Sequence, residues 1–356
     1  MTRYRAAIVG TGAIAGAHAQ ALRAHDDRAD LTAVVDVDPA RAEAFAAEWA
    51  VPVIEKDLTD VLKNVDIVHI CTPPAVHASL TREALRAGVH VVLEKPPTLS
   101  LAELDSLAAA SRESAAHLAT IFQHRFGTGA DRLRAMLAAG ELGRPMLATC
   151  ETLWHRDGDY YAVPWRGRWD TEGGGPTMGH GIHQFDLMLS VLGPWAQVTA
   201  VAARRARPVQ TEDVSMALVT FADGALASVV NSVLSVRQVS RLRFDFEHAT
   251  VELSHLYGYT DADWTITPAA GHEGLAAKWT ADAGTEESSH TRQLAEVLDA
   301  LDRGVEPPVT IADTRNTMEF VAAIYASAFS GRPIDRGAIT PDHPFAARMN
   351  GTGAPW

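Results

Sequence analysis

The sequence predicts an N-terminal doubly wound α/β domain followed by an α+β domain with an open, mostly antiparallel sheet. Over the first 125 residues, short apolar runs alternate with helical patterns, which is typical of a parallel sheet covered by helices on both faces. After about residue 127, segments of alternating polar and apolar residues follow one another, as they do in antiparallel strands. We therefore expect one domain over residues 1–125 and a second over 126–356.

Length, composition and charge agree with two domains and narrow the class of protein. The chain has 356 residues, of which 47% are hydrophobic and 21% charged, as in ordinary globular proteins. A net charge of −13 without a basic block argues against nucleic acid as a partner. Cys71 and Cys150 lie far apart in apolar settings, which indicates reduced cysteines and a cytoplasmic protein. No apolar stretch approaches the roughly 20 residues that span a bilayer, so we expect no membrane partner.

The first apolar run leads into a glycine turn, a helical pattern and a second apolar run that ends at Asp36. This order of strand, Gly-x-Gly-x-x-Ala turn, helix, strand and acid predicts a dinucleotide-binding Rossmann unit. Gly10 permits the turn, and Gly12 lets backbone N–H groups approach a pyrophosphate at the start of the helix. Asp36 suits the free ribose hydroxyls of NAD and would repel the 2′-phosphate of NADP. The expected phosphate-binding turn comprises Gly10, Gly12, Ala13 and Ile14.

Helices are expected over about 39–49, 58–62, 77–87 and 101–113, and strands over 51–53, 66–71, 89–93 and 117–122. In parallel sheets, ligands collect at the carboxyl ends of the strands. Besides the glycine turn and Asp36, this rule selects Thr72, Pro73, His77, Glu94, Lys95 and Arg125.

Lys95 is the first candidate for chemistry. It ends a strand beside Glu94 and precedes two prolines, and the peptide bond before either proline is a candidate for the cis form. A lysine that is partly desolvated near a nicotinamide cation would have its pKa lowered toward a useful acid–base range. The alternative is a surface lysine paired with Glu94.

The second candidate stretch runs from Glu172 through three glycines to Asp186. His180, His183 and Asp186 recur every three residues, so they lie near one face at the start of a helix over 180–192. His183 could transfer a proton from a substrate hydroxyl, the three side chains could share a metal ion, or they could be core and capping residues. The glycine run indicates close backbone approach to another group, which favours a site.

The third candidate is an aromatic and basic loop over 154–170. Aromatic rings stack on the C–H faces of sugars, and arginines bind hydroxyls or anions, which raises the possibility of an anionic sugar. The same residue types are common at domain and subunit interfaces, so this alternative stays open. The candidate substrate-binding residues of this loop are Trp154, His155, Arg156, Tyr160, Trp165 and Arg166.

The remaining elements of the second domain are predicted from alternation and helical spacing. Strands are expected over 145–151, 198–203, 214–221, 225–234, 241–246 and 250–253, and further helices over 130–139, 291–301 and 315–330.

Together these motifs resemble the Gfo/Idh/MocA family, the relatives of glucose–fructose oxidoreductase and inositol dehydrogenase. The resemblance covers residues 3–335 and is carried by the glycine turn, the Thr72-Pro73-Pro74-x-x-His77 loop, Glu94-Lys95-Pro96, Arg125-Phe126 and the Gly173–Asp186 stretch. It implies NAD(P)-dependent chemistry on a sugar or polyol hydroxyl, with Lys95 and His183 at the positions of the family's catalytic lysine and histidine. It also implies face-to-face packing into homodimers or homotetramers.

The sequence departs from the family at one position. Many members carry an aspartate four residues before the catalytic histidine, whereas this chain has Gly179 followed by His180. Either His180 substitutes for the aspartate, or Lys95 and His183 act alone.

Three functions are compatible with these motifs. The first is an NAD-dependent dehydrogenase of a sugar, sugar derivative or glycoside. In it, His183 takes the hydroxyl proton, Lys95 polarises the oxygen, and these residues with His180 and Arg125 contact the substrate. The second is an NAD-dependent glycoside hydrolase that uses transient C3 oxidation, elimination, water addition and re-reduction. The third is a dinucleotide-sensing regulator without enzymatic activity. No metal cofactor is expected in any of them.

Overall fold

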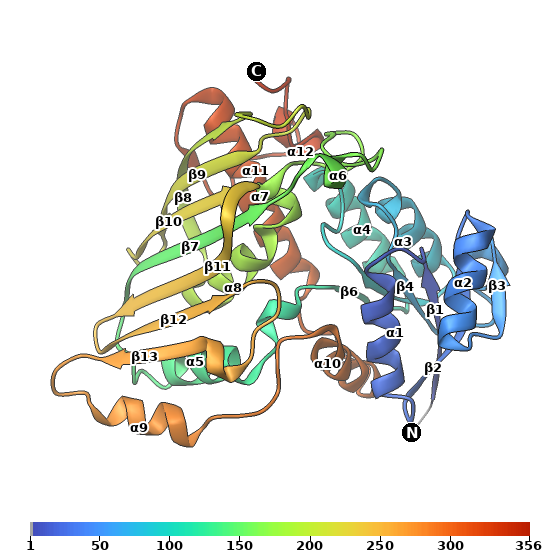
Figure 1. Ribbon diagram of the computed structural model, residues 1–356, viewed down its shortest axis with the longest axis horizontal. Coiled ribbons are helices and arrows are strands. Elements are labelled where there is room, and N and C mark those ends of the chain that lie inside the picture. The colour runs from blue at the N-terminus through green and yellow to red at the C-terminus, as the bar shows by residue number, and fades with distance from the viewer. Residues whose placement is uncertain (1–2) are drawn as a thin grey trace. The chain divides into compact units, whose positions relative to one another are not determined.

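The computed structural model describes residues 3–356, which divide into two compact units (Figure 1). The first unit takes residues up to 98 together with 102–121 and 290–315. The second takes residues 99–101, 122–289 and 316–356.

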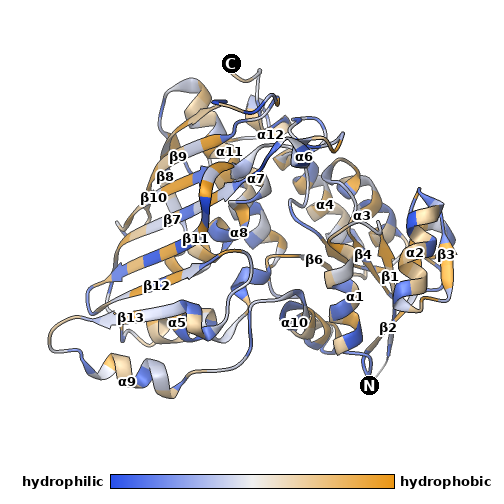
Figure 2. Ribbon diagram, in the orientation of Figure 1, coloured by the Kyte–Doolittle hydropathy of each residue, from blue (hydrophilic) through white to orange (hydrophobic). Residues whose placement is uncertain are grey.

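The first unit contains a six-stranded sheet in the order β3-β2-β1-β4-β5-β6, with every neighbouring pair parallel. This confirms the expected doubly wound architecture. Figure 2 shows hydrophobic residues along β1 and β4 at the centre of this sheet. The strands are β1 Tyr4–Val9, β2 Ala29–Val35, β3 Val53–Glu55, β4 Ile67–Ile70, β5 His90–Leu93 and β6 Leu118–Thr120.

Helices cover both faces of this sheet because each face carries its own set of buried apolar side chains. Leu22 of one helix packs in the core of one face, and Leu85 and Leu107 of two others pack in the core of the opposite face. The helices are α1 Ala15–Ala24, α2 Pro39–Trp49, η1 Leu58–Asp60, η2 Pro74–Val76, α3 His77–Arg86, α4 Leu101–Glu113 and α10 His290–Asp302.

Helix α10 differs from the sequence-based domain assignment, which placed all residues after 125 in the second domain. Leu294, Val297 and Leu298 of α10 belong to the same buried cluster as Ala19 and Leu22 of α1. The helical spacing of these apolar residues was readable from the sequence. Their packing partner, helix α1, could not be predicted, because periodicity identifies the buried face of a helix but not the element against which that face packs.

The second unit contains an eight-stranded sheet in the order β13-β12-β11-β7-β10-β9-β8-β14. Its pairs are antiparallel except β10 with β7, which confirms the expected mostly antiparallel sheet. The strands are β7 Pro145–His155, β8 Trp195–Ala203, β9 Val214–Phe221, β10 Leu226–Ser232, β11 Leu234–Phe246, β12 Ala249–His255, β13 Trp264–Pro268 and β14 Ile334–Asp335.

One face of this sheet is covered by α8 and α11, where the Phe320 ring packs against the rings of Phe185 and Trp195. The helix expected over 180–192 is present as α8, which begins at Ile182, and a separate short helix, α7, precedes it at residues 176–179. The helices of this unit are η3 Gln123–Arg125, α5 Thr128–Ala138, α6 Gly158–Tyr161, α7 Pro176–Gly179, α8 Ile182–Leu192, η4 Asp261–Asp263, α9 Gly274–Ala281, α11 Ile311–Ser330 from residue 316 onward, and α12 Pro344–Ala347.

The opposite face of the same sheet carries exposed apolar side chains. On β9, buried and exposed residues alternate, and Met216 and Leu218 are 51% and 67% exposed. Val201 of β8 lies directly opposite Met216, and Leu226 of β10 is also exposed, so these side chains share one face. An apolar surface of this extent is typical of an interface.

Over residues 3–356, the structure contains no helix that is both long enough and apolar enough to cross a bilayer.

Candidate functional site

The glycine turn after β1 has the geometry that a dinucleotide site requires. Gly10 has φ of +89°, and a Cβ at this position would lie 2.9 Å from Thr72, so no larger residue fits. A Cβ at Gly12, in contrast, would meet no protein atom within 4 Å. Packing within the protein therefore requires glycine at position 10, whereas position 12 borders open space into which a cofactor fits.

Asp36 lies at the end of β2 and is 7% exposed. One carboxylate oxygen accepts hydrogen bonds from the backbone N–H and the hydroxyl of Thr11, both at 2.8 Å. The other accepts from the Asp38 N–H and from Arg41 Nη2, each at 2.9 Å. Burial alone would raise the pKa of Asp36, but the N–H groups of Asp38 and Thr11 outweigh it and hold the pKa below its usual value. Asp36 is therefore an ionised acceptor beside the turn, as a ribose site requires.

The loop after β4 is joined to the turn after β5 by His77. The imidazole Nε2 lies 2.8 Å from the Thr72 carbonyl and Nδ1 lies 2.9 Å from the Pro96 carbonyl. Burial lowers the pKa of His77, so the neutral ring donates to one carbonyl at a time. His77 was predicted to bind the cofactor, but its ring contacts point to a positioning role. The Thr72 hydroxyl is buried without a hydrogen-bond partner among the described residues, which fits an absent ligand group.

Glu94 ends β5 and is 4% exposed. Its Oε1 accepts hydrogen bonds from His18 Nε2 at 2.9 Å and His290 Nε2 at 2.8 Å, and its Oε2 accepts from the Lys95 N–H at 3.1 Å. Burial raises the pKa of Glu94, but these two imidazoles outweigh burial and place it well below its usual value. The carboxylate was predicted to bind the cofactor. Both of its oxygens are instead used to hold α1 and α10 to the start of the Lys95 turn.

The Glu94 contacts also define the tautomer of the neighbouring imidazoles. His18 Nε2 donates to Glu94, so its neutral ring accepts at Nδ1, where His69 Nδ1 lies 2.8 Å away. His69 therefore donates at Nδ1. Ligand atoms of His18, Glu94 and His290 all lie within 4.8 Å of one another, but the direct hydrogen bonds among them account for this proximity.

Lys95 lies in the first unit, and the bond between it and Pro96 is cis, as the sequence allowed. His183 lies in the second unit, in α8, and is 1% exposed. The imidazole of His183 packs against His124, with ring centroids 4.7 Å apart, and against Tyr257 at 5.7 Å. His124 and Tyr257 were not predicted as site residues. His124 follows a strand end, and that signal identified its neighbour Arg125.

His180 lies beside the aromatic loop, just before the start of α8. Its Nε2 lies 3.2 Å from Arg156 Nε and 3.4 Å from the Tyr160 hydroxyl, and its ring meets that of Trp154 edge-on at 5.0 Å. Arg166 donates a hydrogen bond to the same Tyr160 hydroxyl. Burial raises the pKa of Tyr160 to about 12, so this phenol stays protonated at neutral pH.

The remaining predicted residues of this loop are placed as follows. Trp154 is 6% exposed and its indole N–H donates to Ser240 Oγ at 3.0 Å, so the ring is a buried wall of the His180 cluster. His155 Nε2 lies 3.2 Å from Arg207 Nη2. Trp165 lies under the Arg166 guanidinium, 4.3 Å from its Cζ, rather than against His180. Of the predicted residues, Trp154, Arg156 and Tyr160 therefore contact His180 directly.

The glycine run after Glu172 approaches protein atoms rather than a ligand. A Cβ at Gly174 would lie 2.2 Å from the Tyr325 hydroxyl, and one at Gly175 would lie 2.0 Å from the Glu212 carbonyl. The Glu212 carboxylate accepts the N–H groups of Gly175 and Thr177 at 3.1 and 3.0 Å. The sequence favoured a site at this run. The glycines are instead required because α7 packs closely against Glu212 and Tyr325.

Gly179 lies four residues before His183, at the position where the family resemblance led us to expect an aspartate. The nearest atom to a Cβ built there is Glu172 Oε1, at 3.8 Å, and Gly179 does not have a positive φ. Glu172 is 4% exposed, and its Oε2 accepts the Gly167 N–H at 2.5 Å. A carboxylate therefore lies beside position 179, supplied by a different residue. The sequence analysis did not select Glu172 as a site residue; it noted only that an aspartate is missing at position 179.

Arg125 and Asp186 form a paired ion contact. Arg125 Nε and Nη2 donate to the two Asp186 oxygens at 2.5 and 2.7 Å, and the hydroxyl of Thr317 donates to Asp186 at 3.1 Å. Asp186 is fully buried. These contacts indicate a structural role for Arg125, which was predicted to bind substrate. They also argue against a metal ion shared by His180, His183 and Asp186, because both Asp186 oxygens face other donors.

The fold and these residues define a dinucleotide-binding oxidoreductase. Residues 4–122 match the oxidoreductase family with an NAD-binding Rossmann fold, and residues 130–252 match the Gfo/Idh/MocA C-terminal domain. The chain belongs to the Gfo/Idh/MocA family, and its first unit is an NAD-binding Rossmann domain. This confirms the family and the cofactor inferred from the motifs.

Relatives with assigned activities match almost the whole chain. D-glucoside 3-dehydrogenase of Escherichia coli (strain K12) is 28% identical over 360 residues, which cover 93% of this chain and 97% of the relative. D-apiose dehydrogenase of Paraburkholderia graminis is 26% identical, covering 99% and 94%. Among solved structures, the WlbA dehydrogenase of Bordetella pertussis in complex with NADH and UDP-GlcNAcA has a TM-score of 0.83 and 26% identity, covering 94% of this chain and 98% of that one.

The residues present fit NAD. Gly12 leaves space beside the start of α1, Asp36 offers an ionised carboxylate to ribose hydroxyls, and the buried Thr72 hydroxyl lacks a partner within the described chain.

Proposed function

We propose that the protein oxidises a hydroxyl of a sugar, sugar derivative or glycoside with NAD as the hydride acceptor. The observation that carries this proposal is the pairing of an NAD-binding Rossmann unit with a second unit whose buried imidazoles, His180 and His183, are surrounded by aromatic and arginine side chains. The activities named for the D-glucoside and D-apiose relatives support the same substrate class.

In this proposal, the chain's own residues bind the substrate and move a proton. Bound NAD supplies the hydride acceptor. Lys95 polarises the substrate oxygen, and His183 takes the hydroxyl proton as general base. The aromatic ring of Tyr160 contacts C–H faces of the sugar and excludes water from it, and the buried ring of Trp154 supports His180. Fixed positions of these groups account for much of the rate enhancement.

We further propose that Glu172 compensates for the absence of an aspartate at position 179. An aspartate built at Gly179 would place its carboxylate in the region that Glu172 Oε1 now borders, at 3.8 Å from the Cβ position. Glu172 Oε1 lies 3.5 Å from Arg166 Nη1, and Arg166 donates to the Tyr160 hydroxyl beside His180, so the negative charge of Glu172 would act on the histidines through this group. The expected result is a loss of kcat of roughly 10- to 100-fold in Glu172→Gln, as for a charged partner of a general base. A second substitution, Gly179→Asp, should restore activity, because position 179 has room for a side chain.

A second candidate function is NAD-dependent glycoside hydrolysis through transient oxidation at C3, elimination, water addition and re-reduction. The hydrogen-bonded group of His180, Arg156 and Tyr160 favours it, because elimination and hydration need an acid–base group in addition to His183. Release of an aryl aglycone that requires NAD but yields no net NADH would support this function over the dehydrogenase.

The experiment is a panel of sugars, uronates and aryl glycosides with NAD, followed by the absorbance of reduced nicotinamide and by aglycone release. Lys95→Ala and His183→Asn should abolish turnover, whereas Lys63→Ala, at an exposed lysine of the first unit, should leave it unchanged. NAD binding with no turnover of any compound would instead support a dinucleotide-sensing regulator.

We also propose that the protein is a homo-oligomer that pairs through the exposed apolar face of the second unit's sheet. Leu218 and Met216 lie on this face. Leu218→Lys should shift the protein to monomers in light scattering, and an unchanged mass would contradict the assignment of this face.

A further inference from the structure

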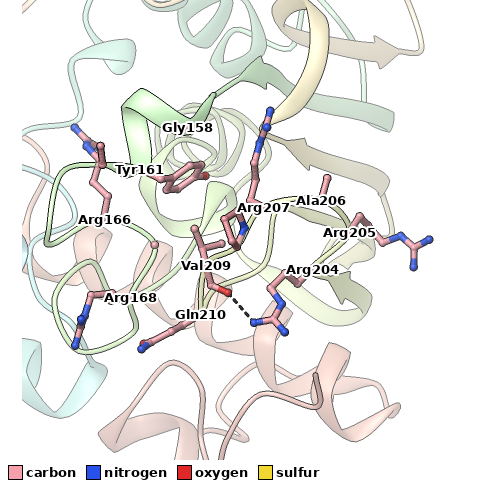
Figure 3. Close-up of a pocket in the computed structure, with 13 residues that line it drawn as sticks. Gly158, Tyr161, Arg166, Arg168, Arg204, Arg205, Ala206, Arg207, Val209 and Gln210 are labelled. Carbon is pink, nitrogen blue, oxygen red and sulfur yellow. Dashed lines mark hydrogen bonds between the residues drawn. The ribbon is translucent and has the colours of Figure 1, made fainter.

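A pocket of about 870 Å³ lies in the second unit between the aromatic loop and the turn after β8 (Figure 3). Its volume is at the upper end of the range for small-molecule sites. Five arginines line it and no carboxylate does. Figure 3 shows Arg166 and Arg168 on one side, Arg204, Arg205 and Arg207 on the other, and the Tyr161 ring between them, with Arg205 extending away from the rest. The lining is Gly158, Tyr161, Ala162, Arg166, Gly167, Arg168, Arg204, Arg205, Ala206, Arg207, Pro208, Val209 and Gln210.

The turn over residues 204–207, which follows β8 and which we call the arginine turn, is held in place by a buried carboxylate. Asp213 is fully buried, and it accepts the backbone N–H groups of Arg205, Ala206 and Arg207 at 2.7, 2.7 and 2.9 Å. The Asp213 carboxylate is thus bound to the backbone of the turn; Arg204 and Arg205 are exposed, and Arg207 is partly buried. The position of the turn is therefore determined by the fold and not by its arginine side chains.

The three arginines of this turn lack an acidic partner. Arg204 donates to the Val209 carbonyl at 2.8 Å and Arg207 to His155 Nε2 at 3.2 Å. Within residues 3–356, none of Arg204, Arg205 and Arg207 forms an ion pair with a carboxylate. Placing three like charges in one fixed turn is unfavourable, and the single carboxylate of Asp213 against the backbone of the turn offsets only part of that charge. The arrangement therefore points to a ligand that brings negative charge.

The pocket adjoins the His180 cluster through two neighbouring tyrosines. The Tyr160 hydroxyl lies 3.4 Å from His180, the Tyr161 ring lines the pocket, and the two rings meet edge-on with centroids 5.0 Å apart. Arg166 also belongs to both, because it lines the pocket and donates to the Tyr160 hydroxyl. A substituent of a sugar held beside His180 could thus extend past the loop into the arginine pocket.

We propose that this pocket binds a phosphate or diphosphate group carried by the substrate, so that the sugar on which the protein acts is phosphorylated or linked to a diphosphate. Guanidinium groups form paired, charge-assisted hydrogen bonds with phosphate oxygens. This suits Arg204 and Arg205, which pair with no carboxylate among the described residues, whereas Arg168 on the opposite side is paired with Asp170 at 3.2 Å. The half-buried Tyr161 and buried Val209 offer an apolar surface to the part of the ligand beyond the phosphate. That the ligand includes a sugar rests on the proposed function, whereas the binding of an anion rests on the pocket alone.

The test is calorimetric titration of inorganic pyrophosphate into protein saturated with NADH, so that the phosphate-binding turn of the first unit is already filled. Wild-type protein should bind pyrophosphate, and affinity should fall with added NaCl. The double variant Arg204→Ala/Arg205→Ala should weaken binding by about 10-fold or more, since it removes charge-assisted contacts. Arg204→Lys/Arg205→Lys should retain part of the affinity. Arg144→Ala is the matched control, an exposed arginine of the same unit that is paired with Glu247.

Kinetic measurements separate this inference from the proposed function. Glucose 1-phosphate, a nucleoside-diphosphate glucose and glucose are compared as substrates with wild type and the double alanine variant. An increase in KM for the charged substrates but not for glucose, with kcat retained, supports the inference, and the charged substrate with the larger increase identifies a single phosphate or a diphosphate as the preferred group. Pyrophosphate binding that is lost in the variant, without turnover of any sugar, supports the anion site while the proposed function fails. Absent binding in wild type, or equal binding in wild type and variant, overturns the inference.

Discussion

Replacing Glu94 by glutamine tests whether its carboxylate holds the NAD-binding unit together. Glu94 is 4% exposed and accepts three N–H groups, two imidazole and one backbone. A glutamine side chain has one acceptor oxygen and one amide group. Whichever way it is oriented, its NH₂ group faces the Lys95 N–H or the two imidazole N–H groups. At least one buried donor is then unsatisfied.

An unsatisfied buried donor costs about 1–3 kcal/mol, and loss of a charge-assisted bond adds to this, so Glu94→Gln should destabilise the first unit by roughly 2–4 kcal/mol. Native-state hydrogen exchange in peptides from α1 and α10 reports this unit alone. Protection there should fall by about 30- to 700-fold. Glu43→Gln, at an exposed residue of α2, is the control and should leave protection unchanged. Protection in Glu94→Gln within threefold of wild type would refute the assigned role.

Three further predictions concern single groups. Asp36→Ala should weaken NAD binding by roughly 10-fold or more and improve NADP binding, measured by titration of both cofactors; unchanged preference would contradict the ribose assignment. Asp186→Asn should cost about 3–5 kcal/mol in urea unfolding, because Arg125 loses a buried charge partner. Burial lowers the pKa of His18 and His69 below the usual 6.5, so the unfolded chain binds more protons at acid pH. The midpoint temperature of thermal unfolding should therefore decrease as the pH is lowered from about 6.5, and a midpoint that does not change with pH would contradict this.

The parallel sheet and the NAD turn could be predicted because their signals are local. Gly10 must adopt a positive φ in a strand–turn–helix unit, and Asp36 ends the next strand, so both follow from short sequence patterns. The antiparallel alternation of β9 is equally local, since every second residue is buried.

Roles that depend on distant partners could not be predicted from the sequence. Glu94 was expected at the cofactor, but its acceptors are filled by His18 and by His290, a residue 196 positions away. Arg125 was expected at the substrate, but Asp186 holds it through two hydrogen bonds. The glycine run at 173–175 indicated close approach correctly, yet the approaching groups belong to Glu212 and Tyr325. In each case the residue type indicated a close or polar contact, but the sequence did not identify the residue on the other side of that contact.

The most direct test of the proposed function is the amount of NADH formed per sugar consumed, measured in one reaction at saturating NAD. The proposed dehydrogenase predicts equal amounts of the two, with no turnover in Lys95→Ala. Consumption of sugar or glycoside that depends on NAD but leaves no net NADH would contradict it.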